Sequence, residues 1–163
     1  MVFQDEVSAA LSAMILSHSG WRGIFAVSGQ PSLCGSPLCG GEESRSGKIS
    51  AAHRIIAAGA AAVFADYLRS RGESTPLILA GRDTRPTGKA IAEAMIPALL
   101  ARGCRVRYAG VIAAPEIMAW ARSLGNCGFV YISASHNPIG HNGFKFGLAD
   151  GGILPADEAH KLT

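Results

Sequence analysis

The chain has 163 residues, a length typical of one domain with a single hydrophobic core. Apolar residues make up 48% of it and charged residues 17%, which argues against intrinsic disorder. The formal net charge of +3 is too small to indicate a nucleic-acid footprint. Eleven of the fifteen cationic side chains are Arg, which favours carboxylate or phosphate ligands because a guanidinium binds them through two donors.

The first part of the chain is expected to hold two helices separated by a strand and a long loop. The apolar spacing of Val2 to Ser17 predicts an amphipathic helix, and Trp21 to Val27 predicts a short strand. Ser28 to Lys48 is rich in Gly, Ser and Pro, which predicts a surface loop. A helix is expected from Ala51 to about Arg71, with Ser50 as its N-cap.

Predicted strands and helices alternate from residue 76 onward. The expected elements are strands at Pro76–Ala80, Cys104–Tyr108 and Cys127–Ser133, a helix at Gly88–Arg102 capped by Thr87, and a helix from Pro115 to Leu124. A last strand, Phe144 to Leu148, follows a loop too short for a crossover helix and is therefore expected to be antiparallel. This alternation predicts an α/β fold, a three-layer α/β/α sandwich with a mixed, mostly parallel sheet. Pro155 to Thr163 is typical of a helix that has only begun, so we expect a longer protein.

Cellular context follows from what the sequence lacks. Ile55 to Ala65, the most apolar stretch, is shorter than the roughly 20 residues that cross a bilayer. Asp5 and Glu6 lie where a secretory signal carries positive charge. The four cysteines form no C-x-x-C pair, so we expect Cys104 and Cys127 to pack as small apolar residues. We expect a cytoplasmic protein with neither a membrane nor a nucleic acid as partner.

Three polar segments are expected near the carboxyl ends of strands, where open α/β sheets bind ligands. They are Ser19-Gly20-Trp21-Arg22, Gly81-Arg82-Asp83-Thr84-Arg85 and Ser133-Ala134-Ser135-His136-Asn137-Pro138. In the third segment a strand ends and the chain turns at once, which can project Ser135 from the edge of the sheet. An ordinary polar turn has the same composition, because Ser and Asn are common in turns.

Several chemistries are open to Ser135. A serine hydrolase is disfavoured because the G-x-S-x-G elbow is absent and because neighbours in extended chain, such as Ser135 and His136, point apart. A metal site at His136 and His141 lacks a third His or Cys in the region. The chain has neither a Walker loop nor a G-x-G-x-x-G fingerprint, which argues against a nucleotide cofactor.

A phosphate carrier fits Ser135 better. Phosphoryl transfer needs an in-line acceptor, cations against the phosphoryl oxygens and a proton shuttle. Arg22 and Lys145 are candidates to supply the charge, and Lys145 lies on a strand that returns toward the Ser135 turn. The alternative for Lys145 is a solvated edge residue. The alternative for Arg82 and Arg85, which bracket Asp83, is a local ion pair that organises the loop.

Four motifs, in order along the chain, resemble those of the α-D-phosphohexomutases, the phosphoglucomutase/phosphomannomutase superfamily. The motifs are Gly20-Trp21-Arg22-Gly23, Gly81-Arg82-Asp83-Thr84-Arg85-Pro86-Thr87-Gly88, Ser133-Ala134-Ser135-His136-Asn137-Pro138 and Asn142-Gly143-Phe144-Lys145. The resemblance covers nearly the whole chain. It implies that residues 1–163 are domain I, the active-serine domain, and that the other three domains of the family are absent from this chain. It implies an intramolecular phosphotransferase that interconverts hexose 1-phosphate and hexose 6-phosphate through a phosphoserine and a hexose 1,6-bisphosphate.

The resemblance also implies roles for individual residues. Ser135 would carry the phosphoryl group, with His136, Lys145 and Arg22 as the other catalytic residues. Ser19 and Asn137 join Arg22 and Lys145 as the implied phosphate-binding residues. Mg²⁺ would bind through a phosphate oxygen on Ser135, with its other ligands in the family's second domain. The isolated chain is then expected to be inactive. A non-catalytic α/β module that binds a phosphate or a sugar is the alternative.

Overall fold

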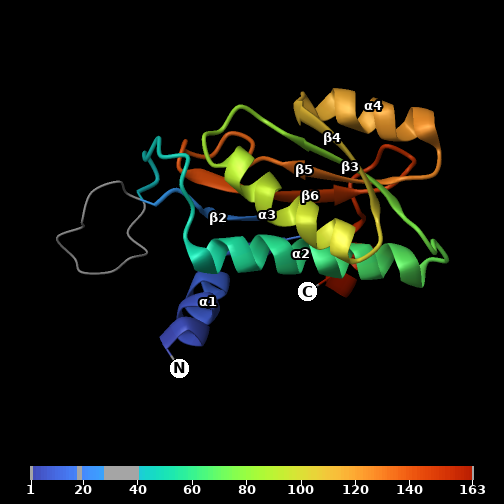
Figure 1. Ribbon diagram of the computed structural model, residues 1–163. Coiled ribbons are helices and arrows are strands. Elements are labelled where there is room, and N and C mark those ends of the chain that lie inside the picture. The colour runs from blue at the N-terminus through green and yellow to red at the C-terminus, as the bar shows by residue number, and fades with distance from the viewer. Residues whose placement is uncertain (1, 18–19, 28–40, 163) are drawn as a thin grey trace.

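A computed structural model describes residues 2–17, 20–27 and 41–162. In these ranges a six-stranded mixed sheet lies between layers of helices (Figure 1). The strands are β1 (Ile15–Ser17), β2 (Gly20–Ile24), β3 (Leu77–Arg82), β4 (Arg105–Val111), β5 (Gly128–Ile132) and β6 (His141–Gly147). The helices are α1 (Val2–Ser12), α2 (Ala51–Ser70), α3 (Gly88–Ala101), α4 (Ala114–Leu124) and α5 (Ala156–Ala159), with a 3₁₀ turn at His160–Leu162.

The sheet has the strand order β1-β2-β6-β5-β3-β4. β3 pairs in parallel with β4 and β5, whereas β6 is antiparallel to both β5 and β2, and β1 is antiparallel to β2. The predicted α/β fold with a mixed sheet is therefore confirmed, as is the antiparallel direction of the last strand. The four strands β2 to β5 run the same way. The described pairs are nevertheless more often antiparallel, because β1 and β6 each run against every neighbour they have.

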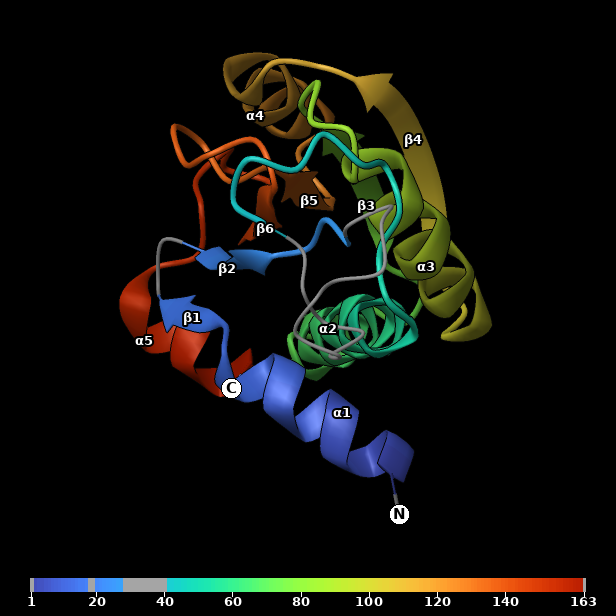
Figure 2. The same cartoon turned by 90° about the vertical axis from the view of Figure 1, so that its left-hand side faces the viewer.

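Alternate side chains of the central strands enter two different cores. On one face, β3 and β5 pack against α4; this core contains Leu77, Leu79, Phe129, Tyr131, Ile117 and Ala121. On the other face they pack against α2 and α3; the residues involved include Ile78, Val130, Ile132, Phe64, Ile91 and Leu99. A period of two along each strand thus buries both faces, as expected for a sheet inside a sandwich. Figure 2 shows α4 on one side of the sheet and α2 and α3 on the other.

The predicted N-terminal helix is wrong over its last residues. α1 ends at Ser12, and Ile15–Ser17 forms the edge strand β1. In this strand Ile15 pairs with Arg22 and Leu16 with Trp21. The backbone of β2 would otherwise have no partner on that side, and an unpaired strand edge is costly to leave open. Pairing with a neighbour in the fold therefore overrides the helical spacing of the apolar residues.

One predicted helix cap is confirmed and another is wrong. The Ser50 hydroxyl accepts a hydrogen bond from the His53 N–H at 3.1 Å, which begins α2 as predicted. Thr87 makes no side-chain cap to α3. Its Oγ1 instead accepts a hydrogen bond from Asn142 Nδ2 at 2.9 Å, and both side chains are fully buried. Thr87 therefore joins the start of α3 to β6.

The two cysteines named above pack as predicted. Cys104 and Cys127 are buried, and neither forms a disulfide. Burial raises the pKa of both thiols, so they are poor nucleophiles. Across the described residues, no helix combines the length and hydropathy needed to cross a membrane.

Candidate active site

Ser135 lies on an exposed turn at the carboxyl end of β5. The turn belongs to residues 133–141, here called the serine loop, which connect β5 to β6 and include His141, the first residue of β6. Ser135 has a φ of 54° in the left-handed region, which L-residues rarely adopt. Its backbone N–H donates to the Ser133 hydroxyl at 3.0 Å. The side chain of Ser135 therefore projects from the edge of the sheet.

Lys145 and Arg22, on two adjacent strands, line the same hollow as Ser135. In the β2–β6 register Arg22 pairs with Gly143, two positions before Lys145 on the same face of the sheet. Phe144, between them, points into the opposite core. The Lys145 ammonium donates to the Ser135 hydroxyl at 2.8 Å. A small hollow beside this pair is lined by Gly20, Trp21, Arg22, Ser133, Ala134, Ser135, Phe144 and Lys145.

The electrostatics of this hollow favour an anion. Burial lowers the pKa of Lys145, and the positive charge of Arg22 lowers it further, while the negative charge of Asp83 opposes both. Two cationic side chains, Arg22 and Lys145, thus line the same hollow as the Ser135 hydroxyl. Such an arrangement suits a phosphate, whose oxygens accept hydrogen bonds from ammonium and guanidinium groups. A lysine with a lowered pKa also exchanges a proton more readily near neutral pH.

Arg85 is a site residue that the sequence did not reveal. Its side chain is buried, and its guanidinium Nε lies 3.3 Å from a carboxylate oxygen of Asp83. This confirms the local ion pair expected at residues 82–85. The same guanidinium also donates to backbone carbonyls of the serine loop; the acceptors are Ser135, Asn137, Pro138 and His141. Nothing in the spacing of the residues distinguishes this role from a solvated pair.

Asn142 and Gly143 build the strand that carries Lys145. Asn142 Oδ1 accepts from the Gly143 N–H at 2.9 Å, while its amide nitrogen donates to Thr87. A Cβ on Gly143 would collide with the Trp21 carbonyl oxygen and lie 2.9 Å from the Arg22 Cα. The Asn-Gly pair therefore lets β6 approach β2 closely enough to align Arg22 with Lys145.

The remaining predicted site residues lie around this centre. His136 is exposed at the next position of the turn. The described bonds of Asn137 come from its backbone, whose N–H donates to the Ala134 carbonyl and whose carbonyl accepts from Arg85. Neither residue lines the hollow. Ser19 and most of the predicted loop 28–48 lie outside the described residues. The structure thus brings together Ser135, Lys145 and Arg22.

His141 faces the described end of the predicted loop. Its Nε2 is buried without a hydrogen bond, 3.3 Å from the exposed Glu42 carboxylate. The backbone reinforces this approach, because the Gly140 N–H donates to the Glu42 carbonyl at 2.6 Å. The segment after residue 40 therefore packs against the serine loop.

The donors near Ser135 do not form a magnesium site by themselves. Among the described residues, no group of three His, Cys, Asp or Glu side chains could hold a metal ion. Asp83, the carboxylate whose charge acts on Lys145, already accepts from the Arg85 N–H and pairs with its guanidinium. Mg²⁺ prefers six oxygen ligands. An ion at a Ser135 phosphate would need further ligands from outside these residues.

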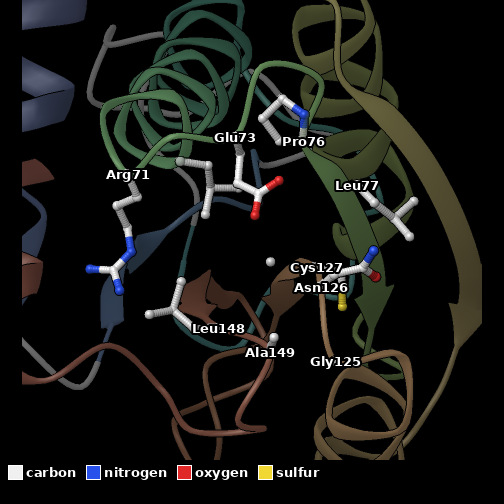
Figure 3. Close-up of a pocket in the computed structure, with 11 residues that line it drawn as sticks. Arg71, Glu73, Pro76, Leu77, Gly125, Asn126, Cys127, Leu148 and Ala149 are labelled. Atoms are coloured by element: carbon white, nitrogen blue, oxygen red, sulfur yellow. The ribbon is translucent and has the colours of Figure 1, made fainter.

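A separate hollow lies at the opposite edge of the sheet, where β3 and β5 begin. Figure 3 shows its lining, which includes Arg71, Glu73, Asn126 and Cys127. Arg71 also contacts the Tyr67 hydroxyl at 3.2 Å and the Glu158 carboxylate at 3.5 Å. None of the predicted site residues lines this hollow. We therefore place the candidate chemistry at the serine loop.

The fold and the serine loop define an α/β domain with an exposed serine hydroxyl in contact with a lysine, and comparisons with known proteins agree with this fold. Residues 41–163 match the family model described as phosphoglucomutase/phosphomannomutase, alpha/beta/alpha domain I. The chain belongs to this family.

The names of individual relatives refer to different sugars. Phosphoglucosamine mutase of Staphylococcus aureus strain JH9 is 38% identical over 93 residues, which are 57% of this chain and 21% of the relative. A solved candidate phosphomannomutase of Thermus thermophilus has a TM-score of 0.64 and 25% identity over 92% of this chain and 29% of its own. A phosphoglucomutase/phosphomannomutase family protein of Burkholderia thailandensis has a TM-score of 0.59 at 23% identity, covering 91% and 30%. The chain thus spans under a third of each relative.

Proposed function

We propose that this chain is the phosphoserine domain of a phospho-sugar mutase that interconverts hexose 1-phosphate and hexose 6-phosphate. The observation that carries the proposal is the 2.8 Å contact between Lys145 Nζ and Ser135 Oγ on an exposed turn. Membership of the phosphoglucomutase/phosphomannomutase family supports it. The names of the relatives indicate hexose phosphates as a class.

In the proposed reaction, Ser135 starts as its phosphate ester. A sugar hydroxyl oxygen attacks the phosphorus, its bond to phosphorus forms, and the bond between phosphorus and Ser135 Oγ breaks. Lys145 donates a proton to the leaving Oγ, and His136 accepts the proton of the attacking hydroxyl. Arg22 offsets the negative charge on the phosphoryl oxygens.

The second half of the reaction is the reverse of the first. The sugar now carries two phosphates, one at each position. After it turns round, the Ser135 oxygen attacks the other phosphate, Lys145 takes the serine proton and His136 returns a proton to the departing sugar oxygen. Phosphoserine is restored, and the sugar leaves with its phosphate at the new position. Atoms and protons balance over the cycle.

We further propose that the described residues do not turn over substrate alone. The hollow beside Ser135 has a cavity volume of only about 10 Å³, far below the roughly 300 Å³ of small ligand pockets. Further domains of the family would enclose the sugar and supply oxygen ligands for Mg²⁺. That ion would stabilise the charge on the phosphoryl group when bound.

The first prediction is that Ser135 accepts a phosphoryl group. The chain is incubated with glucose 1,6-bisphosphate and Mg²⁺, and the product is analysed by intact mass and peptide mapping. We expect one phosphoryl group on Ser135 and none on Ser135→Ala. Ser123→Ala is the matched control, because Ser123 is exposed on α4 and its hydroxyl donates to the Trp120 carbonyl. It should be labelled like the wild-type chain.

The sugar-enclosing domains can be supplied by a chimera. This chain replaces the matching segment of the Staphylococcus aureus phosphoglucosamine mutase, and mutase turnover is measured with and without Ser135→Ala. A chimera in which Ser135→Ala keeps near-normal turnover would refute the phosphoserine mechanism. So would a phosphoryl group found elsewhere than on Ser135 in both the chain and the chimera.

A further inference from the structure

Arg85 gathers four backbone carbonyls of the serine loop around one buried cation. Nη2 donates to the Ser135 carbonyl at 2.8 Å and to the Asn137 carbonyl at 2.6 Å. Nη1 donates to the carbonyls of Pro138 at 2.5 Å and His141 at 3.1 Å. A guanidinium can do this because its donors lie in one plane and point in fixed directions, whereas a lysine ammonium is a compact point charge.

The serine loop has few backbone partners of its own near the reacting hydroxyl. Asn137 N–H donates to the Ala134 carbonyl, and His141 N–H donates to the Pro138 carbonyl. The carbonyls of Ser135 and Asn137, for which Arg85 is the donor, would otherwise point into a partly buried region without a described partner, which is costly. The guanidinium therefore takes the place that a neighbouring strand takes in a regular sheet.

Ser135 is held on both sides of its strained backbone. Its N–H donates to Ser133 Oγ, and its carbonyl accepts from Arg85. Between these two bonds φ is 54°, a conformation that persists only where the surroundings enforce it. Relaxation to a negative φ would turn the Cβ–Oγ bond away from Lys145. The hydrogen bond from Arg85 to the Ser135 carbonyl therefore helps to fix the direction in which the Ser135 hydroxyl points.

We propose that Arg85 is a positioning residue, which holds Ser135 Oγ against Lys145 Nζ and thereby sets the rate at which Ser135 exchanges a phosphoryl group. Arg85 does not line the hollow beside Ser135, so it acts through the loop. Asp83 keeps the guanidinium in place from the other side, through an ion pair at 3.3 Å and a bond from the Arg85 N–H at 3.0 Å. The effect on rate rests on the proposed function; the effect on the loop does not.

Two measurements on the full chain test this. The first is the rate of Ser135 phosphorylation against the concentration of glucose 1,6-bisphosphate. The second is amide hydrogen exchange of residues 133–141 compared with β3 and β5. The variant is Arg85→Lys, which keeps the positive charge and loses the planar set of guanidinium donors. The control is Arg82→Lys, because Arg82 lies in the same segment but donates to Tyr108 and the Asp83 carbonyl.

For Arg85→Lys we expect maximal phosphorylation to be roughly tenfold to a hundredfold slower, as for other small misplacements of a reacting group. The half-saturating donor concentration should stay unchanged, because Arg22 and Lys145 remain. Amide hydrogen exchange should become faster in residues 133–141, and its rate should stay unchanged in β3 and β5. Arg82→Lys should match the wild-type chain in both measurements. Wild-type rate and exchange in Arg85→Lys, or equal effects in both variants, would overturn the proposal.

Two further outcomes are separable. If Ser135 is not phosphorylated even in the wild-type chain or its chimera, the proposed function fails, and exchange alone decides whether Arg85 orders the loop. If Arg85→Lys does not fold, Asp83→Asn replaces it, because this change removes the counter-ion and leaves all four donors. A smaller rise in exchange confined to residues 133–141 supports the proposal. No rise there contradicts it.

Discussion

Lys145 combines a short contact to a hydroxyl with a pKa that burial and Arg22 both lower. Burial and the charge of Arg22 both weaken the hold of Lys145 on its proton. A less strongly held proton is more easily passed to a departing oxygen. The negative charge of the neighbouring Asp83 opposes this lowering of the pKa. A lysine on a solvated strand edge, which was the alternative from the sequence, would lack these contacts.

The second prediction concerns this lysine. Lys145→Ala should slow phosphoryl transfer to or from Ser135 about 10²-fold or more, as loss of a positioned proton donor does. The side chain is half-buried and is not part of either hydrophobic core, so the thermal midpoint should move little. Transfer rate and thermal midpoint are measured on the same preparation. Lys161→Ala is the control, since Lys161 contacts Glu158 far from the site. An unchanged transfer rate in folded Lys145→Ala would argue against this role.

The third prediction concerns His53, which is a buried titratable group outside the site. Its ring packs against Phe25 with centroids 4.6 Å apart, and Nδ1 lies 2.9 Å from Ser50 Oγ. Burial lowers the pKa of His53 from its usual value of 6.5. The unfolded chain therefore binds a proton at a higher pH than the folded chain does. Stability is full above the unfolded pKa and declines as pH falls through it toward the lower folded pKa.

Urea unfolding at about pH 7.5 and about pH 5.5 checks this dependence. The free energy of unfolding should fall at the lower pH, by at most about 1.4 kcal/mol per pH unit for one proton. His53→Gln keeps a polar group beside Ser50 but cannot titrate, so its stability should change less between the two conditions. Equal pH dependence in both proteins would assign the effect to other groups.

Among the elements, β2 and β6 are paired so closely at Gly143 that no side chain fits between their backbones. Gly143 leaves room for the Trp21 carbonyl, and this contact brings Arg22 into register with Gly143. A side chain at this position would have to push two paired strands apart. The Asn-Gly step of the fourth motif is thus explained by packing as well as by its closeness to Lys145.

The fourth prediction follows for Gly143→Ala. The added methyl group should cost about 3 kcal/mol, at the upper end for overpacked sites. Gly59→Ala is the matched control, because among the described residues, apart from the adjacent backbone of α2 itself, no atom lies within 4 Å of the position its Cβ would take. That change in α2 should stabilise the chain by about 1 kcal/mol. Chemical denaturation of both variants gives the difference, and a neutral Gly143→Ala would contradict the close approach.

The edge strand β4 shows why strand boundaries were hard to place. The sequence predicted Cys104–Tyr108, whereas the strand runs to Val111. Its register with β3 shifts after Tyr108, so that Gly110 rather than Ala109 pairs with Gly81, and Gly110 has a φ of 69°. This bulge and the exposed Arg105 and Arg107 protect an open edge from pairing with other chains. The alternation of inward and outward side chains, from which the strand was predicted, is interrupted at this bulge, so the sequence pattern does not show that the strand continues.

At the scale of the whole molecule, the local signals were enough for the fold class. Gly and Pro at element ends and the buried strands at residues 77–82 and 128–132 predicted the α/β alternation correctly. The edge strand β1 was missed because its existence depends on β2, far more than on its own spacing. Thr87 was misread for the same reason, since its partner Asn142 is 55 positions away.

The candidate site was predictable where a motif carried it. Ser135, Lys145 and Arg22 were named from the sequence, and the structure brings them together in one hollow. The contact of Arg85 with the serine loop was not predicted, because a buried guanidinium and a solvated one look alike in a sequence. The catalytic roles themselves stay predictions until phosphorylation is measured.

The sheet itself sets the distances between the hydroxyl, the ammonium and the guanidinium. Arg22 and Lys145 stand on neighbouring strands about 4.8 Å apart, and Ser135 follows the next strand along. These three residues already line one hollow, so the proposed phosphoserine site needs no large rearrangement to form. On the proposed function, the reorientation of a bisphosphate is then motion of the sugar relative to groups whose spacing is set by paired strands.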